Sequence, residues 1–523
     1  MVELPVQRPA GPAARGPDVL ALLGLRRFLR WRHARLALQL PLLLLAAFVV
    51  VDGLTGRQLA PRNVATTAVW LHYRGLVVLA LLLVGNLFCA ACPLMLTRGV
   101  ARWTQRVLGR TWRWPRRLRS KALAVVLMLL FVYAYEAFAL WSSPWLTAWL
   151  AIGYFGAAWW VDSLFPAGTF CRYVCPLGNF NYVLASTSPT QIATVDPAVC
   201  DRCEGKPCLH GRVTDAGAPR REWLTAEGRL RGDRDGPRRA AFVPLEAVVA
   251  PNGTGRFPGC ETGLFVPQVT ANLDCTLCFN CLRACPYDNV ALRLRAPWHE
   301  AARDGWRHRG RRGALVLGVL LAWWGLMNAF AMVPPYFAAA DAVARVLGTR
   351  AEWWVLAVML AVTSAAGFGA TVAVAWAADR AGGRRSGPWA ALDRWGYVVV
   401  IVGVGFWAAH YLFHFLTGAL AIVPVFQHFF AYRGFDVDPA WRLAQVVPSR
   451  WLFPIGAAVV SGAAAVALVA TVHIALRDFG RRGIGPIWVF GAFVVAVVVV
   501  QVIVLGLPME MRGTLLGPLP VAP

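Results

Sequence analysis

Residues 275–286 read CTLCFNCLRACP, which places Cys275, Cys278, Cys281 and Cys285 ahead of Pro286. This is the bacterial Cys-x2-Cys-x2-Cys-x3-Cys-Pro spacing, in which three thiolates surround one [4Fe–4S] cluster and the fourth ligates another. A zinc site can use Cys-x2-Cys pairs, but zinc does not readily account for this asymmetric run. The stretch therefore predicts an iron–sulfur domain that carries single electrons.

A second cluster requires further cysteines, and the sequence supplies them upstream. Cys200, Cys203 and Cys208 form Cys-x2-Cys-x4-Cys, and Cys260 stands alone. The crosswise pattern of two-cluster domains assigns Cys285 to the first run and Cys260 to the second. The predicted ligand sets are then Cys200, Cys203, Cys208 and Cys285 for one cluster, and Cys260, Cys275, Cys278 and Cys281 for the other. A sequential arrangement, with Cys200, Cys203, Cys208 and Cys260 on one cluster, is the alternative.

The composition indicates a membrane protein. The chain has 523 residues, 58% of them hydrophobic, and several stretches exceed the roughly 18 uncharged residues that cross a bilayer. The net charge is +25, but the arginines cluster in loops between apolar segments, so the positive-inside rule explains them better than a nucleic-acid partner. All twelve cysteines fall into motifs, and thiolates that ligate iron must stay reduced, which favours the cytoplasmic side.

The apolar pattern predicts an α-helical polytopic membrane protein with a ferredoxin-like α+β domain inserted on the cytoplasmic side. Basic loops place the N-terminus inside, the C-terminus outside and residues 167–312 in the cytoplasm, as expected for the bacterial inner membrane. An alternating stretch over 290–295 predicts a short strand. We expect nine spanning helices, near 36–54, 75–97, 121–141, 145–166, 313–334, 353–377, 396–424, 452–476 and 485–507.

These helices divide the chain into five regions. The first apolar run, 36–54, is long enough to remain a helix and lacks a small-residue cleavage site, so we expect no cleaved signal peptide. The expected regions are a basic cytoplasmic N-terminal arm (1–35), a four-helix membrane domain (36–166), a cytoplasmic two-cluster domain (167–312) with a polar insertion (211–250), a five-helix membrane domain (313–507) and an outer C-terminal tail (508–523).

Two further cysteine pairs end helices of the first membrane domain. The second helix ends in Cys89-Ala-Ala-Cys92-Pro, and the fourth ends in Cys171-Arg-Tyr-Val-Cys175-Pro. Each proline ends or bends its helix, and each pair follows a helical hairpin, which indicates an internal duplication. Four thiols at one depth are candidate ligands of a third metal centre, an iron–sulfur cluster or zinc. The alternative is two redox-active or merely reduced thiol pairs.

Residues 75–295 resemble the NosR/NapH-type membrane ferredoxins, most specifically at Cys171–Pro176 and Cys275–Pro286. In that family, helices end in Cys-x3-Cys-Pro before a cytoplasmic two-cluster domain; Cys89–Pro93 is one residue shorter. The resemblance implies electron transfer between the quinone pool, or a cytoplasmic donor, and a respiratory or maturation partner. The flavin-bearing domain of NosR is absent, and the last five helices lie outside the resemblance.

Ionisable residues inside the bilayer are candidate quinone or proton sites. Glu136 lies deep in the third helix, and His410 and His414 lie one turn apart on the seventh. These side chains can alternatively make plain helix–helix hydrogen bonds. We do not expect haem, since two histidines one turn apart cannot ligate one iron from both faces; His72 and His428 are the remaining partners at plausible depth.

The sequence thus favours an electron carrier or oxidoreductase subunit rather than a stand-alone enzyme. It would carry two [4Fe–4S] clusters and exchange electrons with membrane quinone, with a cytoplasmic ferredoxin or flavodoxin, or with a respiratory complex. A redox-sensing or maturation factor for a respiratory metalloenzyme is the alternative class. A transporter is a third class, which the sparse charge inside residues 313–507 argues against.

Overall fold

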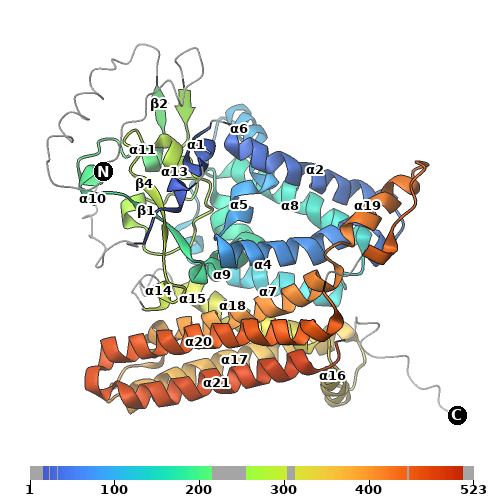
Figure 1. Ribbon diagram of the computed structural model, residues 1–523, viewed down its shortest axis with the longest axis vertical. Helices are drawn as coiled ribbons and strands as arrows, with labels where there is room; N and C mark the ends of the chain where they lie inside the picture. The colour runs from blue at the N-terminus through green and yellow to red at the C-terminus, as the bar shows by residue number, and fades with distance from the viewer. Residues whose placement is uncertain are drawn as a thin grey trace.

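The computed structural model describes residues 16–22, 24–31, 33–214, 255–302, 312–443 and 447–509. Most of them are helical, and the long helices run roughly parallel or antiparallel in a bundle, with the cysteine-rich domain at one end (Figure 1). Most of the predicted insertion (211–250) and of the C-terminal tail (508–523) falls outside the described residues.

The first half of the bundle contains four helical spans. They are α2 (Ala34–Thr55), a continuous run over 64–83, α7 (Ala122–Ala137) and α8 (Pro144–Leu164). The run over 64–83 consists of α3 (Val64–Thr66), a π-helical stretch (Thr67–Tyr73) and α4 (Arg74–Leu83).

The second half contains α15 (Arg312–Phe330), α17 (Glu352–Ala381), α18 (Pro388–Gly418), α20 (Leu452–Phe479) and α21 (Ile484–Gly506). Helix α18 is buried nearly all round because it lies between the two halves, in contact with α4, α15, α17, α20 and α21 (Figure 1). Small residues permit this packing: a Cβ at Gly403 would overlap the Cβ of Ala322, and a Cβ at Gly405 would overlap that of Ala463.

Six helical stretches among the described residues are long and apolar enough to cross a membrane. The last of them, Ser449–Gly506, contains both α20 and α21, which fold back on each other (Figure 1). Helix α7 is apolar but shorter than 18 residues, and α8 is not among the six. Each of the nine predicted ranges contains helix, yet the count of nine spans stays a prediction.

Some predicted boundaries were wrong. The second span was expected over 75–97, but its helix covers 64–83 and breaks at Gly85, whose φ of 130° is poorly tolerated by other residues. Short α5 (Leu87–Ala91) and a 3-10 turn (Pro93–Leu96) follow. Helices α16 (Pro334–Leu347) and α19 (Ile422–Ala431) are among those that were not predicted, and α18 ends at Gly418 rather than near 424.

Two small antiparallel sheets organise the cysteine-rich domain. Strand β1 (Thr190–Thr194) pairs with β4 (Val290–Leu294), Ile192 opposite Leu292, and β2 (Arg212–Thr214) pairs with β3 (Gly255–Phe257). The strand expected over 290–295 is thereby confirmed as β4. Short helices α10 (Pro197–Asp201), α11 (Pro207–His210) and α13 (Asn280–Ala284) carry cysteines between the strands. The ferredoxin-like assignment of this domain stays a prediction.

The described part of the N-terminal arm packs on this domain. Asp18 forms an isolated bridge with Arg293 of β4, and the backbone N–H of Leu294 donates to the Pro17 carbonyl. Leu20 and Leu29, the latter on α1 (Leu25–Arg30), are buried in the same apolar cluster as Leu292. Residues 16–31 therefore pack against the cysteine-rich domain, while the division of the chain into regions stays a prediction.

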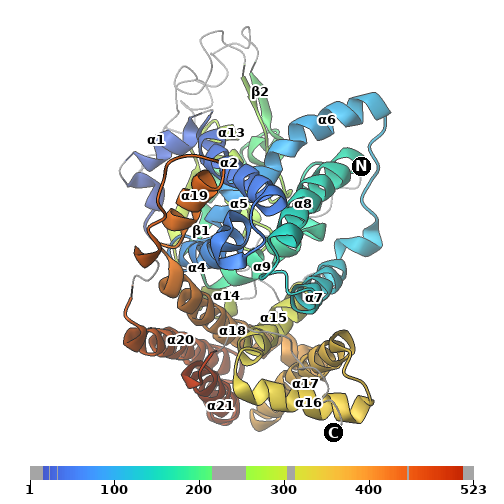
Figure 2. The ribbon, with the colours of Figure 1, turned by 90° about the vertical axis from the view of Figure 1, so that its right-hand side faces the viewer.

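The loops that connect the spans gather at two ends of the bundle. At the end that carries the cysteines, Arg312 pairs with Asp393 at 2.8 Å and Arg477 bonds the carbonyl of Ala302. At the opposite end, Arg433 pairs with Asp52 at 3.3 Å. The spans thus alternate in direction between the two ends, and their orientation in a membrane stays a prediction. Figure 2, turned by 90°, shows the same bundle from another side.

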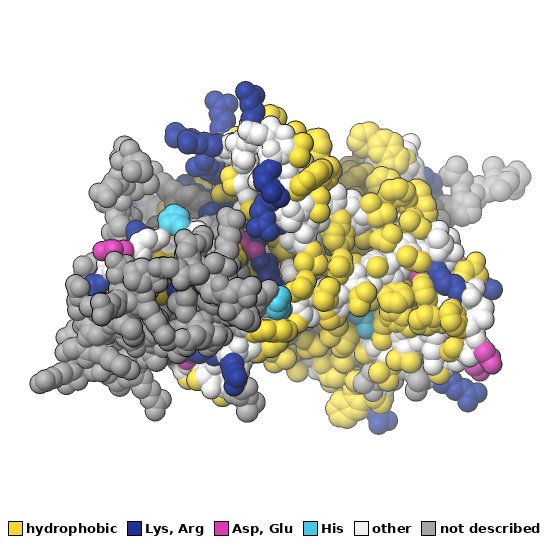
Figure 3. Space-filling view, turned by 90° about the horizontal axis from the view of Figure 1, so that it is seen from above, with side chains coloured by type: hydrophobic (Ala, Val, Ile, Leu, Met, Phe, Trp, Pro, Cys, Tyr) yellow, Lys and Arg dark blue, Asp and Glu magenta, His cyan; other side chains and the backbone are white. Residues whose placement is uncertain are grey.

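Helix α6 (Thr97–Leu108) lies at the cysteine end and is strongly amphipathic. Trp103 and Val107 are exposed on it, and so are Arg102 and Arg106. Figure 3 shows a broad apolar surface over the helices, with many basic side chains where that surface meets the domain. This mixture of apolar and basic exposure is typical of a helix at a membrane surface.

Candidate iron–sulfur site

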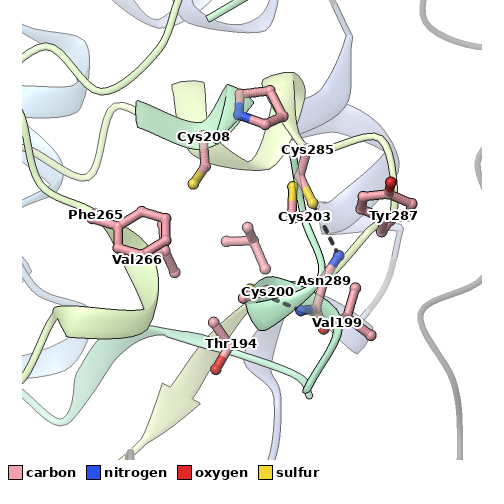
Figure 4. A pocket seen from close by; sticks show the side chains of 12 residues that line it. Thr194, Val199, Cys200, Cys203, Cys208, Phe265, Val266, Cys285, Tyr287 and Asn289 are labelled. Carbon is pink, nitrogen blue, oxygen red and sulfur yellow. Dashed lines mark hydrogen bonds between the residues drawn. The ribbon is translucent and has the colours of Figure 1, made fainter. Parts of the chain in front are cut away.

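Four cysteines line one pocket of the domain (Figure 4). Cys200 lies on α10, Cys203 follows it, Cys208 lies on α11 and Cys285 follows α13. The remaining wall is largely apolar and includes Val199, Phe265, Val266, Tyr287 and Val290. This group, which we call the first group, contains Cys285 and not Cys260, as the crosswise pattern expects; ligation itself stays a prediction.

Hydrogen-bond donors point at two sulfurs of the first group. The Asn289 side chain donates to Cys200 Sγ at 3.1 Å, and its backbone N–H donates to Cys285 Sγ at 3.4 Å (Figure 4). Burial raises the pKa of Cys200 to about 12, against the effect of Asn289, and that of Cys208 to about 11. Without a bound metal these thiols therefore stay protonated, and metal binding would displace their protons.

Cys260, Cys275, Cys278 and Cys281 form a second group. Burial raises the pKa of the Cys275, Cys278 and Cys281 thiols, and nearby Cys260 raises each of them further. The backbone N–H of Leu264 donates to Cys260 Sγ at 3.3 Å. The four thiols of the second predicted set are therefore close together.

The loop of the second group has an unusual backbone. Leu277 and Phe279, on either side of Cys278, have φ of 48° and 55°, and Asp274 has φ of 65°. The left-handed region costs roughly 1–2 kcal/mol per non-glycine residue, so this loop is held in place by its surroundings. Leu277 and Phe279 are both buried, and their burial in the domain core offsets that cost.

Acidic residues beside the cysteines pair with basic residues, and Arg35, Arg98 and Lys121 among these lie outside the domain. Glu261, next to Cys260, pairs with Arg35 of α2 and, at 2.7 Å, with Arg98 of α6. Burial alone would raise the pKa of Glu261, but the two guanidinium groups lower it to about 2. The remaining pairs are Lys121–Asp274, Arg172–Asp274 at 3.3 Å, and Arg26 and Arg30 with Asp288 at 2.6 and 2.7 Å.

The paired cysteines of the membrane domain form a third group, Cys89, Cys92, Cys171 and Cys175. All four are buried, and each interacts electrostatically with at least one other member of the group. Cys275 interacts with Cys89, and Cys281 with Cys208. The second group therefore lies between the other two.

No three His, Cys, Asp or Glu side chains in the described part of the chain come together as a site for a single metal ion. Four thiolates about 2.3 Å from one Zn²⁺ would lie within about 4 Å of one another. Ligands of a cluster surround several metal and sulfide atoms and stand farther apart.

The predicted quinone and proton residues lie in the bundle. Glu136 accepts a hydrogen bond of 2.9 Å from Asn328 and lines a small intramembrane pocket with it. The rings of His410 and His414 are 4.8 Å apart, and His410 Nδ1 has no hydrogen-bond partner among the described residues. His72 contacts the carbonyls of Thr67 and Ala419 through its two ring nitrogens.

Sequence reasoning missed Arg74. Its guanidinium lies over the rings of Trp70, Tyr135 and Tyr411, at 4.7, 4.5 and 5.0 Å, and donates to the Tyr135 hydroxyl at 3.0 Å. Arg74 also interacts electrostatically with His410. The sequence feature that could have indicated this residue is an arginine within the largely apolar stretch 64–83.

Comparison with known proteins gives one partial similarity. The chain is 29% identical over 177 residues to the ferredoxin-type protein NapH of Haemophilus influenzae. The chain resembles NapH. The match covers 31% of this chain and 60% of that relative, and it supports a NapH-like iron–sulfur membrane protein rather than NosR specifically. No family model and no solved structure matches the chain.

Proposed function

We propose that the protein is an integral membrane electron-transfer protein that passes single electrons between a quinone or cytoplasmic donor and a respiratory partner. The carrying observation is the grouping of eight cysteines into two four-thiol sets at one end of an apolar helix bundle. The similarity to a ferredoxin-type protein supports the same function.

Each set would hold one [4Fe–4S] cluster, the first by Cys200, Cys203, Cys208 and Cys285. The thiol donors, the buried and largely apolar walls and the N–H groups aimed at sulfur suit such a cluster. When bound, the clusters supply a one-electron change of iron between Fe³⁺ and Fe²⁺. The chain's own residues set the potential, because hydrogen bonds to sulfur and nearby positive charge stabilise the reduced, more negative state.

We place the quinone contact near Arg74, His410 and His414. A guanidinium held by aromatic rings at membrane depth and a histidine nitrogen without a protein partner can bond the oxygens of a quinone headgroup. Glu136, in its separate pocket with Asn328, would serve proton transfer. Haem has no role in this proposal.

A soluble donor would dock on the basic surface at the cysteine end. Arg102 and Arg106 are exposed there, and the loop that follows is also rich in arginine. An acidic ferredoxin or flavodoxin is complementary to such a surface, so added salt should slow its reaction. The same basic loops orient the protein in the bacterial inner membrane, with the clusters and N-terminus inside and the C-terminus outside.

Anaerobic purification of the full chain tests the proposal. We expect at least about eight irons and eight sulfides per chain, and an electron paramagnetic resonance (EPR) signal on reduction. The double variant Cys200→Ser/Cys203→Ser should lose about four irons, while Arg106→Gln should lose none. Iron-free protein that remains folded would refute the proposal.

Turnover separates the two functional classes. A carrier should show cluster reduction or oxidation by quinol or quinone analogues at a rate that depends on their concentration. A sensor or maturation factor should instead change the state of a partner enzyme without such turnover, and that result would favour the alternative class.

A further inference from the structure

The two cysteine pairs of the third group each end a short helical element before a proline. Helix α5 ends before Cys92, and the turn over Phe170–Val174 ends before Cys175; a proline starts a new helix after each. The two cysteines have nearly the same backbone, with φ of −62° for both and ψ of 122° and 113°. The second cysteine of each pair therefore has the same backbone conformation, although α5 is an α-helix and Phe170–Val174 is a π-helix.

These two pairs share one buried site. Cys92, Cys171 and Cys175 belong to a single apolar cluster with Met95 and Phe170. Cys89 interacts electrostatically with Cys171 and Cys175. At most 9% of each cysteine side chain is exposed, so the site is closed to the soluble thiols that a catalytic disulfide exchanges with.

Hydrogen-bond donors converge on three of the four sulfurs. The Gly178 backbone N–H lies 3.2 Å from Cys175 Sγ, the Asn181 side-chain amide 3.7 Å from Cys89 Sγ, and an Arg98 Nη 4.0 Å from Cys171 Sγ. The first and second groups have donors of the same kind, such as Asn289 on Cys200. Cys171 Sγ itself donates to Met95 Sδ at 3.2 Å. The three donors would stabilise thiolates once a metal-containing group is bound.

The buried hydroxyl of Tyr182, near these sulfurs, supports a bound group at this site independently. Tyr182 is fully buried, and its Oη has no hydrogen-bond partner among the described residues. It lies within electrostatic range of Cys89, Cys171 and Cys175. A buried hydroxyl without a partner costs about 1–3 kcal/mol, so its position is explained if a bound group accepts its hydrogen bond.

We propose that Cys89, Cys92, Cys171 and Cys175 hold a third iron–sulfur cluster, to whose sulfur atoms Tyr182 donates. The inference rests on the proposed function and extends it, since the third group lies on the membrane side of the second, next to Cys275. The three clusters form a series in which each step moves one electron between neighbouring irons. The cluster would lie beside Tyr73 of the second span, which is near Cys89, Cys92 and Cys175.

Iron and sulfide counts on the full-length protein, purified anaerobically, test the inference. Two domain clusters alone give about eight irons; a third cluster raises the count to about ten for [2Fe–2S] or about twelve for [4Fe–4S]. The double variant Cys171→Ser/Cys175→Ser should lose two to four irons and one EPR signal, and keep the other signals. The control Cys200→Ser/Cys203→Ser should lose a different signal and keep that of the third cluster.

Tyr182→Phe tests the hydrogen bond directly, because a purely structural role of Tyr182 would leave the midpoint potential of the third cluster unchanged. It should retain all iron and shift the midpoint potential of the third signal alone to lower values, because one donor to the reduced cluster is lost. Eight irons in the wild type, or zinc bound at the third group, would overturn the third cluster and leave the proposed function intact. The wild-type count decides the matter even if the serine variant fails to fold, and an absence of all iron would overturn the proposed function itself.

Discussion

Arg98→Gln should weaken the attachment of the cysteine-rich domain to the membrane helices. Arg98 pairs with Glu261 at 2.7 Å and with Asp162 at 3.0 Å, and all three side chains are at most 10% exposed. Removing one partner of a buried ion pair costs about 3–5 kcal/mol when the other charge is left without a counter-charge. In Arg98→Gln this applies to Asp162, whereas Glu261 keeps Arg35. We therefore expect a loss of at least about 3 kcal/mol in unfolding free energy.

The assay is denaturant unfolding in mixed micelles, followed by tryptophan fluorescence and by the visible absorbance of the clusters. Arg106→Gln, two turns along the same helix and exposed, should change the unfolding free energy by less than about 0.5 kcal/mol. The double variant Arg98→Gln/Glu261→Gln should lose less than the two single variants together, by more than about 1 kcal/mol. Additive losses, or equal losses for Arg98→Gln and Arg106→Gln, would refute the buried-pair argument.

Three further predictions follow from other parts of the structure. Asn289→Ala should lower the reduction potential of one cluster by on the order of tens of millivolts, because donors to two sulfurs are removed or displaced. The potential is measured by EPR redox titration, and an unchanged value would contradict this prediction. Gly403→Val should destabilise the bundle by about 1–3 kcal/mol through overlap with Ala322, whereas Gly369→Val, with open space around it, should be nearly neutral in the same unfolding assay. Arg74→Gln should slow electron exchange with quinone analogues at least about tenfold while the iron content stays full. This loss corresponds to one good charged hydrogen bond. Exchange at the wild-type rate would show that Arg74 does not belong to the quinone site.

The features that the sequence predicted correctly are those with a local signature. Helical stretches follow from runs of apolar residues, and β4 follows from the alternation after Asn289. The cysteine sets were proposed from spacing alone, and the structure groups the same thiols in space. Their role as ligands is still a prediction.

The features that were missed depend on contacts between distant segments. The second span was expected over 75–97, which leaves out Arg74, and an arginine is costly at membrane depth. The structure accommodates Arg74 because the rings of Tyr135 on α7 and Tyr411 on α18 pack on its guanidinium. These contacts join distant segments, so the local sequence does not reveal them. The partners of Glu261 are equally remote, since Arg35 and Arg98 precede it by more than 160 residues.

The pairing of β1 with β4 has a consequence for biogenesis. The first residue of β1, Thr190, lies opposite the last residue of β4, Leu294, so the chain enters and leaves the inserted domain side by side. Strand β4, which completes the domain, leaves the ribosome only after α8 has been synthesised. The proposed clusters would therefore be assembled in a chain whose first helices are already anchored, and the assembly machinery would work at the lipid surface.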